Sequence, residues 1–441
     1  MARTVLTRTP SGTGNQKKWT YSIWFKRVRD NEESALFCVG DNPSNNMCML
    51  RFDPDVLNFY SNNSNAGRFS TQMKFRDTNG WYHVVLAYDS ANATSDDRVK
   101  FYVNGERIPS SDWTSVSTVA QDTDSKVNST LKIHIGERPD SNAHFEGLMS
   151  HIHFCDGYAY AASDFGSTDS TTGEWKINTT PNVQYGTNGF WILKDGNSVT
   201  DQSPNSNNFA VEAGTLTKSE DNPSNVFATL NALDNYYANS TFYNGSTNVV
   251  FNNSNECFNY STLGMSTGKF YFEGKQISRG NLSNERNYFG VTYSPPDASS
   301  DWLGNNNYSW GYRGDGKVYN SGQLQATYSS FTNGDIIGVA LDVTNSKLYF
   351  SKNGVWQNSA DPANGTNGLS VNAGKTYFFA IGETTGASGV ESATNFGNGY
   401  FQTTAVSSNS GNGYSATGSL GIFQYQPPTG YTALCTKGLN L

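Results

Sequence analysis

Apolar and polar residues alternate along many short stretches of the chain, and turn residues separate these stretches. Residues 19–25 (WTYSIWF) place Tyr21, Ile23 and Phe25 on one face of a predicted strand. An Asn-Gly pair at 104–105 closes a second such run and predicts a hairpin, because both residues tolerate a positive φ. No stretch predicts a helix of more than two turns. Strands this frequent, without intervening helices, indicate packed antiparallel sheets.

The length of 441 residues exceeds that of one ordinary domain. The polar stretch 220–224 (EDNPS) is the predicted boundary region. We therefore expect an all-β protein with two antiparallel β-sandwich domains in tandem, the first over residues 1–215 and the second over residues 216–441.

Composition and charge exclude several classes of protein. The net charge is −8 and no dense run of Lys and Arg occurs, which argues against a nucleic-acid-binding face. No stretch approaches the roughly 20 apolar residues of a membrane span, and residues 1–8 lack the apolar core of a signal peptide. We expect synthesis in a cytoplasm without a signal peptide, and no membrane insertion. The odd number of scattered cysteines, five, predicts free thiols.

The first half carries motifs of a known family of sandwich domains. Residues 80–85 (GWYHVV), 100–105 (KFYVNG) and 145–147 (FEG) together resemble laminin-G-like jelly rolls of the concanavalin type. Residues 191–209 look like the opening strand and turn of such domains, although here they follow the other strands. The resemblance implies a concanavalin-like β-sandwich for the first domain.

The second half resembles a SPRY (B30.2-like) domain over residues 265–400. The motifs that carry this resemblance are 268–273 (GKFYFE), 334–342 (GDIIGVALD), 347–354 (KLYFSKNG) and 395–397 (NFG). The resemblance implies a second concanavalin-like jelly roll, and it implies that loops at one end of the sandwich bind partners.

The order of the two domains adds a further resemblance. Together with the opening at residues 2–10 and the ending at residues 430–436, it is similar to structural proteins of marine bacteriophages that are called tail-fibre, head-fibre or decoration proteins. This resemblance implies a protein made in the host cytoplasm and displayed on the virion surface. Its implied partners are other virion proteins of the capsid or tail. We expect a homo-oligomer or a component present in many copies.

Concanavalin-type folds also include glucanases, so enzymatic chemistry has to be considered. A retaining glycosidase needs two carboxylates about 5–5.5 Å apart, and glucanases of this fold supply them from an E-x-D-x-x-E strand, which is absent here. The carboxylate pairs at 30/32, 53/55 and 122/124 lie in turn-like stretches. No Gly-x-Ser-x-Gly elbow is present either. We expect no enzymatic activity, and glycan hydrolysis is a remote alternative.

Two metal hypotheses arise in the first domain. His151, His153 and Cys155 share one strand face, but residues two apart lie about 6.7 Å apart along a strand, so all three cannot converge on one zinc ion. We expect the histidines to face solvent or a neighbouring subunit. Calcium is possible, with Asp195 and Asp201 as candidates for loop oxygens. No other cofactor is expected.

Aromatic residues gather in the Asn-rich stretch 301–312 of the second domain. The candidates for ligand binding are Trp302, Tyr308, Trp310 and Tyr312, because ring faces beside Asn and Asp suit sugar rings. The alternation of Trp310 and Tyr312 also fits core positions of a strand, which makes the loop residues Trp302 and Tyr308 the favoured pair.

The sequence therefore predicts a non-enzymatic structural protein of a phage particle. It would be displayed on the particle surface as a head decoration, fibre or tail component and act through protein–protein contacts. The alternative is a lectin-like adhesin, a tail-fibre receptor-binding protein that recognises host-surface polysaccharide.

Overall fold

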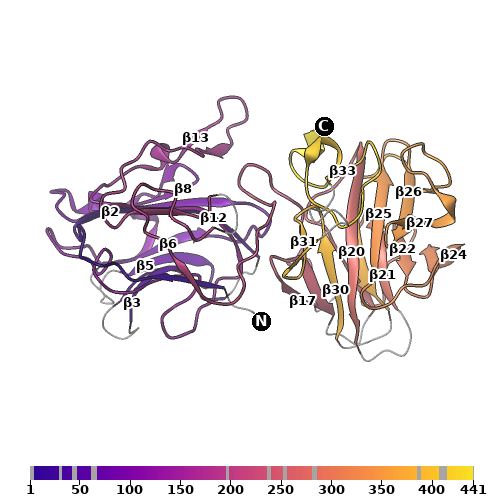
Figure 1. Cartoon of the computed structure of the whole chain (residues 1–441), viewed down its shortest axis with the longest axis horizontal. Helices are drawn as coiled ribbons and strands as arrows, with labels where there is room; N and C mark the ends of the chain where they lie inside the picture. Colours follow the sequence, from indigo (N-terminus) through magenta and orange to yellow (C-terminus); the bar gives the residue numbers. More distant parts are fainter. Residues whose placement is uncertain are drawn as a thin grey trace. The chain divides into compact units, whose positions relative to one another are not determined.

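The computed structural model describes residues 4–28, 32–41, 47–60, 67–194, 198–235, 240–251, 256–280, 286–384, 389–406 and 415–440. The chain divides into two compact units, Met1–Lys218 and Ser219–Leu441 (Figure 1). Strand makes up 44% of the structure and helix 5%, which confirms the predicted all-β class with two tandem sandwiches. Among the described residues, no helix is long and apolar enough to cross a membrane.

The first unit contains two antiparallel sheets that pack face to face. The eight-stranded sheet has the order β10-β6-β5-β4-β3-β11-β1-β16. Its strands are β1 (Val5–Arg8), β3 (Ser34–Gly40), β4 (Met47–Asp53), β5 (Val56–Tyr60), β6 (Arg68–Lys74), β10 (Trp113–Val116), β11 (Ile133–Ile135) and β16 (Ala210–Ala213). The six-stranded sheet has the order β15-β12-β2-β7-β8-β9. Its strands are β2 (Lys18–Arg27), β7 (Tyr82–Asp89), β8 (Val99–Val103), β9 (Glu106–Arg107), β12 (Gly147–Asp156) and β15 (Phe190–Ile192).

Smaller elements complete this unit. A two-stranded arm consists of β13 (Gly166–Thr168) and β14 (Trp175–Ile177). The described helical turns are the 3-10 turns η1 (Ser95–Asp97), η2 (Ser110–Asp112) and η3 (Ala162–Asp164).

The core of the first unit lies between its two sheets. Tyr21, Ile23 and Phe25 of β2 are fully buried there, which confirms the single apolar face predicted for residues 19–25. The ring of Tyr21 stacks on Phe37 of the opposite sheet, with ring centroids 4.3 Å apart. The alternate apolar residues of β2 therefore pack against the opposite sheet and form the core of the sandwich.

The predicted Asn-Gly hairpin is confirmed between β8 and β9. Asn104 has a φ of 46° and Gly105 a φ of 89°, both in the left-handed region. A Cβ atom on Gly105 would also lie 2.4 Å from the Trp175 ring. Glycine is therefore needed here for the turn and for the packing of the arm against it.

The last segment of the first unit supplies an edge strand to each sheet. β15 pairs with β12 in the six-stranded sheet, and β16 pairs with β1 in the eight-stranded sheet. The stretch 191–209, which follows the other strands in sequence, thus leads from β15 to β16, and β16 lies beside the first strand of the unit.

A stretch that we call the outer segment, residues 157–189, covers the outer face of the six-stranded sheet. It packs a second apolar layer onto the strands, with Phe165 and Tyr185 against Val85 and Cys155. Because the outer segment covers this face and the core covers the other, side chains on both faces of the sheet are buried. β2 and β12 are buried over most of their length.

The second unit also contains two packed sheets. The larger has the order β17-β18-β30-β20-β25-β26-β27, with β28 paired to β26 and β33 paired in parallel to β20. Its strands are β17 (Ser240–Tyr243), β18 (Asn248–Phe251), β20 (Lys269–Arg279), β25 (Ile336–Asp342), β26 (Lys347–Lys352), β27 (Val355–Trp356), β28 (Leu369–Ser370), β30 (Val390–Asn395) and β33 (Thr432–Ala433). The six-stranded sheet has the order β19-β29-β21-β22-β23-β24. Its strands are β19 (Cys257–Tyr260), β21 (Asn287–Thr292), β22 (Ser309–Arg313), β23 (Lys317–Asn320), β24 (Gln323–Thr327) and β29 (Phe378–Glu383). The remaining elements are β31 (Tyr400–Phe401), β32 (Thr404–Ala405), η4 (Gln357–Ser359), η5 (Thr417–Ser419) and η6 (Gly438–Asn440).

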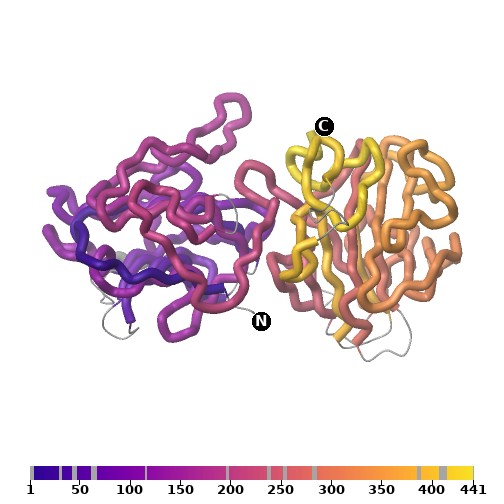
Figure 2. Tube along the Cα trace, in the orientation of Figure 1, coloured from indigo at the N-terminus to yellow at the C-terminus, as the bar shows by residue number. Residues whose placement is uncertain are grey.

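The end of the chain returns to cover the larger sheet of the second unit. Residues 415–435, the C-terminal segment, pack Phe423 and Tyr431 onto Tyr271 and Ala340 of the sheet. Figure 2 shows this yellow segment running alongside β20, from which it is separated by about a third of the chain. The fold of this unit therefore depends on contacts between its beginning and its end.

Candidate functional site

Two of the four predicted ligand-binding aromatics lie inside the core. Trp310 is 4% exposed and Tyr312 is fully buried, both on β22. They occupy alternate positions of the strand, which point to the same face, and here that face is the core. Neither ring is accessible to a ligand, which corrects their assignment as binding residues.

Tyr308 lies in the loop that leads into β22, and its hydroxyl is engaged. The hydroxyl donates to the Asp301 carboxylate and accepts a hydrogen bond of 2.8 Å from the Asn306 amide. Burial is the main reason why the pKa of Tyr308 is raised, and the hydrogen bond to Asp301 adds to it. The ring is half-buried. Tyr308 therefore closes its own loop, and its hydroxyl is not free for a ligand.

Trp302 lies on the outer face of the six-stranded sheet of the second unit. Its ring stacks on Tyr288, with centroids 5.5 Å apart, and meets the edge of Tyr319 at 5.3 Å. The next residue, Leu303, is fully buried over Gly311, where a Cβ atom would lie 2.1 Å from the Leu303 carbonyl oxygen. A glycine in β22 thus allows the loop to lie flat on the sheet and hold Trp302 there.

Trp302 belongs to a partly exposed apolar surface that we call the Trp302 ledge, formed by Trp302, Tyr319 and Leu324. Leu324 is 54% exposed and pairs with Tyr319 across β23 and β24, so the two side chains share the outer face. Arg313 fixes Tyr319 by donating to its hydroxyl at 3.0 Å, while Asp315 holds the same guanidinium in a two-bonded pair. The two rings of the ledge are therefore held in place before any partner binds.

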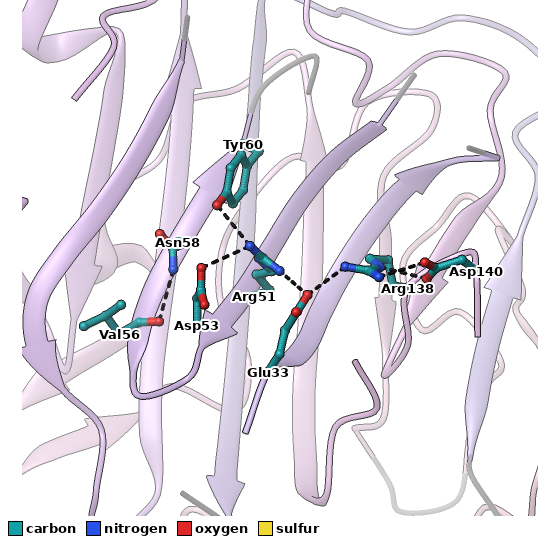
Figure 3. A network of polar contacts seen from close by, with 8 residues as sticks. All are labelled: Glu33, Arg51, Asp53, Val56, Asn58, Tyr60, Arg138 and Asp140. Atoms are coloured by element: carbon teal, nitrogen blue, oxygen red, sulfur yellow. Dashed lines mark hydrogen bonds and ion pairs between the residues drawn. The ribbon is translucent and has the colours of Figure 1, made fainter. Parts of the chain in front are cut away.

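A network of charged side chains joins Glu33, which directly precedes β3, to β4, β5 and the loop after β11 (Figure 3). Arg51 donates to Glu33, to Asp53 at 3.1 Å and to the Tyr60 hydroxyl at 3.0 Å. Arg138 binds Glu33 at 2.8 Å and forms a two-bonded pair with Asp140, with both bonds at 2.7 Å. Since both guanidinium groups are engaged by carboxylates of the protein, this network ties strands together and offers no anion site.

Asn58 lies on β5, close in sequence to Asp53 and Tyr60 of this network. Its amide donates a long hydrogen bond of 3.5 Å to the Val56 carbonyl, and its Oδ1 atom accepts a hydrogen bond from the Ser70 hydroxyl. Asn58 is 1% exposed and Ser70 is 5% exposed. This pair satisfies buried polar atoms within the sheet and adds no accessible group to the network.

A buried Ser-His pair in the first unit looks at first like catalytic machinery. The Ser22 hydroxyl lies 2.9 Å from Nε2 of His83, and the Trp175 indole N–H donates to Nδ1 at 3.0 Å. An indole can only donate, so Nδ1 is unprotonated and Nε2 carries the proton, which it donates to Ser22. A general base would need the opposite tautomer. Burial lowers the pKa of His83 to about 3, which keeps the ring neutral.

Replacing Trp175 with Phe is expected to abolish this tautomer preference and to lower the free energy of unfolding by about 1–2 kcal/mol, because a buried acceptor loses its donor. The nitrogen chemical shifts of His83, measured by NMR, report the tautomer directly. A protonated Nδ1 in the native protein would contradict the assignment.

The structure corrects the predicted exposure of the two strand histidines. His153 is 1% exposed and His151 is 9% exposed, because the outer segment covers their face of the sheet. His153 hydrogen-bonds the Tyr185 hydroxyl at 2.9 Å and stacks on Trp191. Within the described ranges, no group of three or more His, Cys, Asp or Glu residues is placed to hold a metal ion.

The cysteines agree with the prediction of free thiols. In the part of the chain that the structure describes, none is joined to another in a disulfide, and all are buried: Cys38, Cys48, Cys155, Cys257 and Cys435.

Asp201, one of the two calcium candidates, is buried and fastens its own turn. Its oxygens accept hydrogen bonds from the N–H groups of Trp191, Ser203 and Asn207 and from the Ser203 hydroxyl, at 2.7–2.8 Å. Four donors occupy the lone pairs that calcium would use. The other candidate, Asp195, lies outside the described residues.

Comparisons with known proteins agree with the two sandwiches. Residues 4–163 match the concanavalin A-like lectin/glucanases superfamily model Laminin_G_3, and residues 269–369 match the SPRY domain model. The dual specificity protein kinase splA of Dictyostelium discoideum is 37% identical over 99 residues, which is 22% of this chain and 4% of the kinase. The chain spans between 4% and 12% of the length of the curated relatives that it matches.

Two solved structures are similar to parts of the chain. The SPRY domain of human HERC1 is 22% identical with a TM-score of 0.30, over 35% of this chain and 91% of that one. A putative carbohydrate binding protein from Bacteroides ovatus is 15% identical with a TM-score of 0.30, over 49% of this chain and 60% of that one. With the two family matches, the fold leads to one conclusion: the chain carries a concanavalin A-like laminin-G domain in its first unit and a SPRY domain in its second.

Proposed function

We propose that this chain is a non-enzymatic structural protein of a bacteriophage particle, displayed on the particle surface as a head decoration, fibre or tail component. The domain order, the opening at residues 2–10 and the ending at residues 430–436 support the virion context by their resemblance to phage structural proteins. In this role the chain acts through contacts with other capsid or tail proteins and is present in many copies.

The Trp302 ledge is the observation that carries the proposed mode of action. Tryptophan and tyrosine dominate the binding energy of many protein interfaces, especially where they are held rigidly beside an apolar neighbour. Here Leu324 is exposed over half of its surface, and Trp302 and Tyr319 are fixed beside it on a sheet. An apolar surface of this kind gains free energy when a partner protein covers it.

The polar groups of the interior support a binding role over a catalytic one. His83 holds its proton on the nitrogen that faces Ser22, and the buried Asp201 carboxylate accepts four hydrogen bonds. Glu273, buried on β20, is likewise surrounded by four donors. These groups serve the fold.

Replacing Leu324 with Asp is expected to reduce the amount of this protein on purified phage particles by about tenfold, since a charge in the centre of an apolar contact is strongly unfavourable. The amount is measured by quantitative immunoblotting, and immunogold electron microscopy of the native particle locates the chain on head or tail. Val355→Asp is the matched control, because Val355 is 68% exposed on an edge strand of the other sheet.

Native particles without this chain would refute the virion assignment. Equal incorporation of Leu324→Asp and the native chain would refute the ledge as the contact surface. If Leu324→Asp and Val355→Asp were incorporated into particles at equally reduced levels, the ledge would also be refuted as the contact surface, because added charge alone would explain the reduction.

A lectin-like adhesin that binds host-surface polysaccharide is the second candidate. The stack of Tyr158 and Tyr160 in the first unit favours it, because the Tyr158 side chain is 41% exposed. The two functions are compatible in one surface protein.

A further inference from the structure

Asn-Gly pairs recur along this chain, and one of them differs from the others in its contacts. The sequence contains ten of them, and all except Asn412-Gly413 lie among the described residues. In such a pair the backbone nitrogen of glycine can attack the side-chain amide carbon of asparagine, because glycine has no Cβ atom to hinder the approach. In a folded protein the attack depends on how firmly the two groups are held.

Most of these asparagines are held by hydrogen bonds of their side-chain amides. The bonds oppose the rotation that would turn the amide carbon toward the next backbone nitrogen. Two of the held residues, Asn188 and Asn398, are also buried. The held asparagines are Asn79, Asn104, Asn188, Asn333, Asn353, Asn364, Asn367 and Asn398.

Asn244 is the asparagine that is not held in this way. Its side chain is exposed and has no hydrogen-bond partner among the described residues, and the Gly245 N–H donates to none of them either. The pair lies in the turn between β17 and β18, where Asn244, Gly245 and Ser246 have φ values of 51°, 73° and 57°. Left-handed backbone is strained at the two residues other than glycine, and this strain eases the rearrangement that the attack requires.

The Thr247 hydroxyl favours the reaction at this pair. It donates a hydrogen bond of 2.7 Å to the Asn244 carbonyl oxygen, which belongs to the same peptide group as the Gly245 nitrogen. When that nitrogen loses its proton, peptide resonance spreads the negative charge onto the carbonyl oxygen. A hydrogen bond to a charged form stabilises that form, so Thr247 increases the fraction of the nitrogen that can attack.

We propose that Asn244 is a site of spontaneous deamidation, assisted by Thr247, at which the chain forms isoaspartate and aspartate. The Gly245 nitrogen loses its proton to hydroxide and bonds to Cγ of Asn244. The bond between Cγ and Nδ2 breaks, and ammonia leaves with a proton from water. Water then opens the resulting succinimide ring, at the main-chain carbonyl to give isoaspartate or at Cγ to give aspartate. The net reaction consumes water and releases ammonia.

The modification would change the edge of the larger sheet of the second unit. β17 is the outermost strand of this sheet and pairs with β18, with Tyr243 opposite Asn248 next to the turn. Isoaspartate adds a methylene group to the backbone of the turn, so the hairpin loses the turn geometry that fixes its register. We therefore expect β17 to loosen. This inference goes beyond the proposed function and does not depend on it.

The test incubates the purified full chain in mildly alkaline and mildly acidic buffers made with heavy-oxygen water. Peptide mapping by mass spectrometry then measures the conversion of each Asn-Gly pair, and the heavy oxygen marks the aspartate and isoaspartate formed during the incubation. Conversion at Asn244 is expected to be about tenfold faster than at any of the held asparagines, because no side-chain hydrogen bond has to break first. It is expected to be faster in the alkaline buffer, because the attacking nitrogen has to lose a proton.

Three variants, each checked for folding by circular dichroism melting, test the role of the contacts. Thr247→Val removes the hydroxyl and is expected to slow conversion of Asn244 about threefold or more, whereas Thr247→Ser keeps the hydroxyl and should react at the native rate. Asp361→Ala is the reciprocal control, because it removes the carboxylate that accepts the Asn364 amide at 2.6 Å. It is expected to speed conversion of Asn364 and to leave that of Asn244 unchanged.

Hydrogen exchange of the aged chain is expected to show lost protection at β17, with the pairing of β20 and β25 still protected. Equal conversion of Asn244 and the held asparagines, or no heavy oxygen at Asn244, would overturn the proposal. A native rate in Thr247→Val would refute the part assigned to the Thr247 hydroxyl.

Discussion

Replacing Glu273 with Gln is expected to remove most of the pH dependence of stability between about pH 4.5 and pH 7. Glu273 lies fully buried on β20, beneath the C-terminal segment. Its carboxylate accepts the N–H groups of Gln424 at 2.9 Å and Tyr425 at 2.8 Å, the Asn395 amide at 3.1 Å and the Tyr271 hydroxyl at 3.2 Å. Burial raises its pKa to about 7, and these four hydrogen bonds oppose the shift without cancelling it.

The sign of the effect follows from proton binding. Between its ordinary pKa near 4.5 and its folded value of about 7, the Glu273 carboxyl group binds more protons in the folded chain than in the unfolded chain. The free energy of unfolding therefore falls as pH rises through this interval, by about 3 kcal/mol in total. Glutamine cannot titrate, so the variant lacks this slope.

Urea unfolding of the full chain at several pH values, with hydrogen exchange read separately for each unit, measures the effect. The decrease of the free energy of unfolding with pH is expected in the second unit, which contains Glu273. Glu212→Gln serves as the control, because Glu212 is an exposed glutamate of the first unit, and it should leave the slope of the second unit unchanged. A pH profile of Glu273→Gln that matches the native profile would show that another group controls it. The variant is also expected to lose stability at every pH, since an amide N–H₂ would face a backbone N–H.

Asp201→Ala is expected to have an effect of similar size in the first unit, a loss of about 3–5 kcal/mol. The substitution leaves three buried N–H groups and the Ser203 hydroxyl without their acceptor, and each unsatisfied donor is costly. Ser203→Ala removes one of these donors and is expected to cost about 1 kcal/mol. Thermal melting of the full chain measures both.

The same variants test the calcium hypothesis. Since protein donors already occupy the Asp201 carboxylate, removing divalent cations with a chelator is expected to leave the melting temperature of the native first unit unchanged. A rise of the melting temperature with added calcium that disappears in Asp201→Ala would contradict the structural role and assign a metal to this turn.

The sequence predicts the fold better than it predicts the accessible residues. Alternation in residues 19–25 determines the core face of β2, because successive side chains of a strand point to opposite faces of the sheet. The same alternation at Trp310 and Tyr312 is equally compatible with a ligand surface and with the core, and the structure places both side chains in the core. Period alone cannot distinguish the two faces of a sheet.

The features missed by the sequence are those that join distant residues. The stack of Tyr158 and Tyr160 depends on Thr20, 138 residues earlier than Tyr158, and the tautomer of His83 depends on Trp175, 92 residues later. The burial of His153 follows from the outer segment, whose path over the sheet no local pattern reveals. These contacts arise from chain topology, and an alternating pattern carries no information about it.

The pairing of β1 with β16 has a mechanical consequence. Val5 lies opposite Ala213 in an antiparallel pair, so the points where the chain enters and leaves this ladder are at the same end of it. A force that pulls these two points apart loads the hydrogen bonds one after another, starting at Val5, instead of all together. Under tension along the chain, the first unit would therefore open at this seam by unzipping, at low force, while the strands farther from the seam still carry no load.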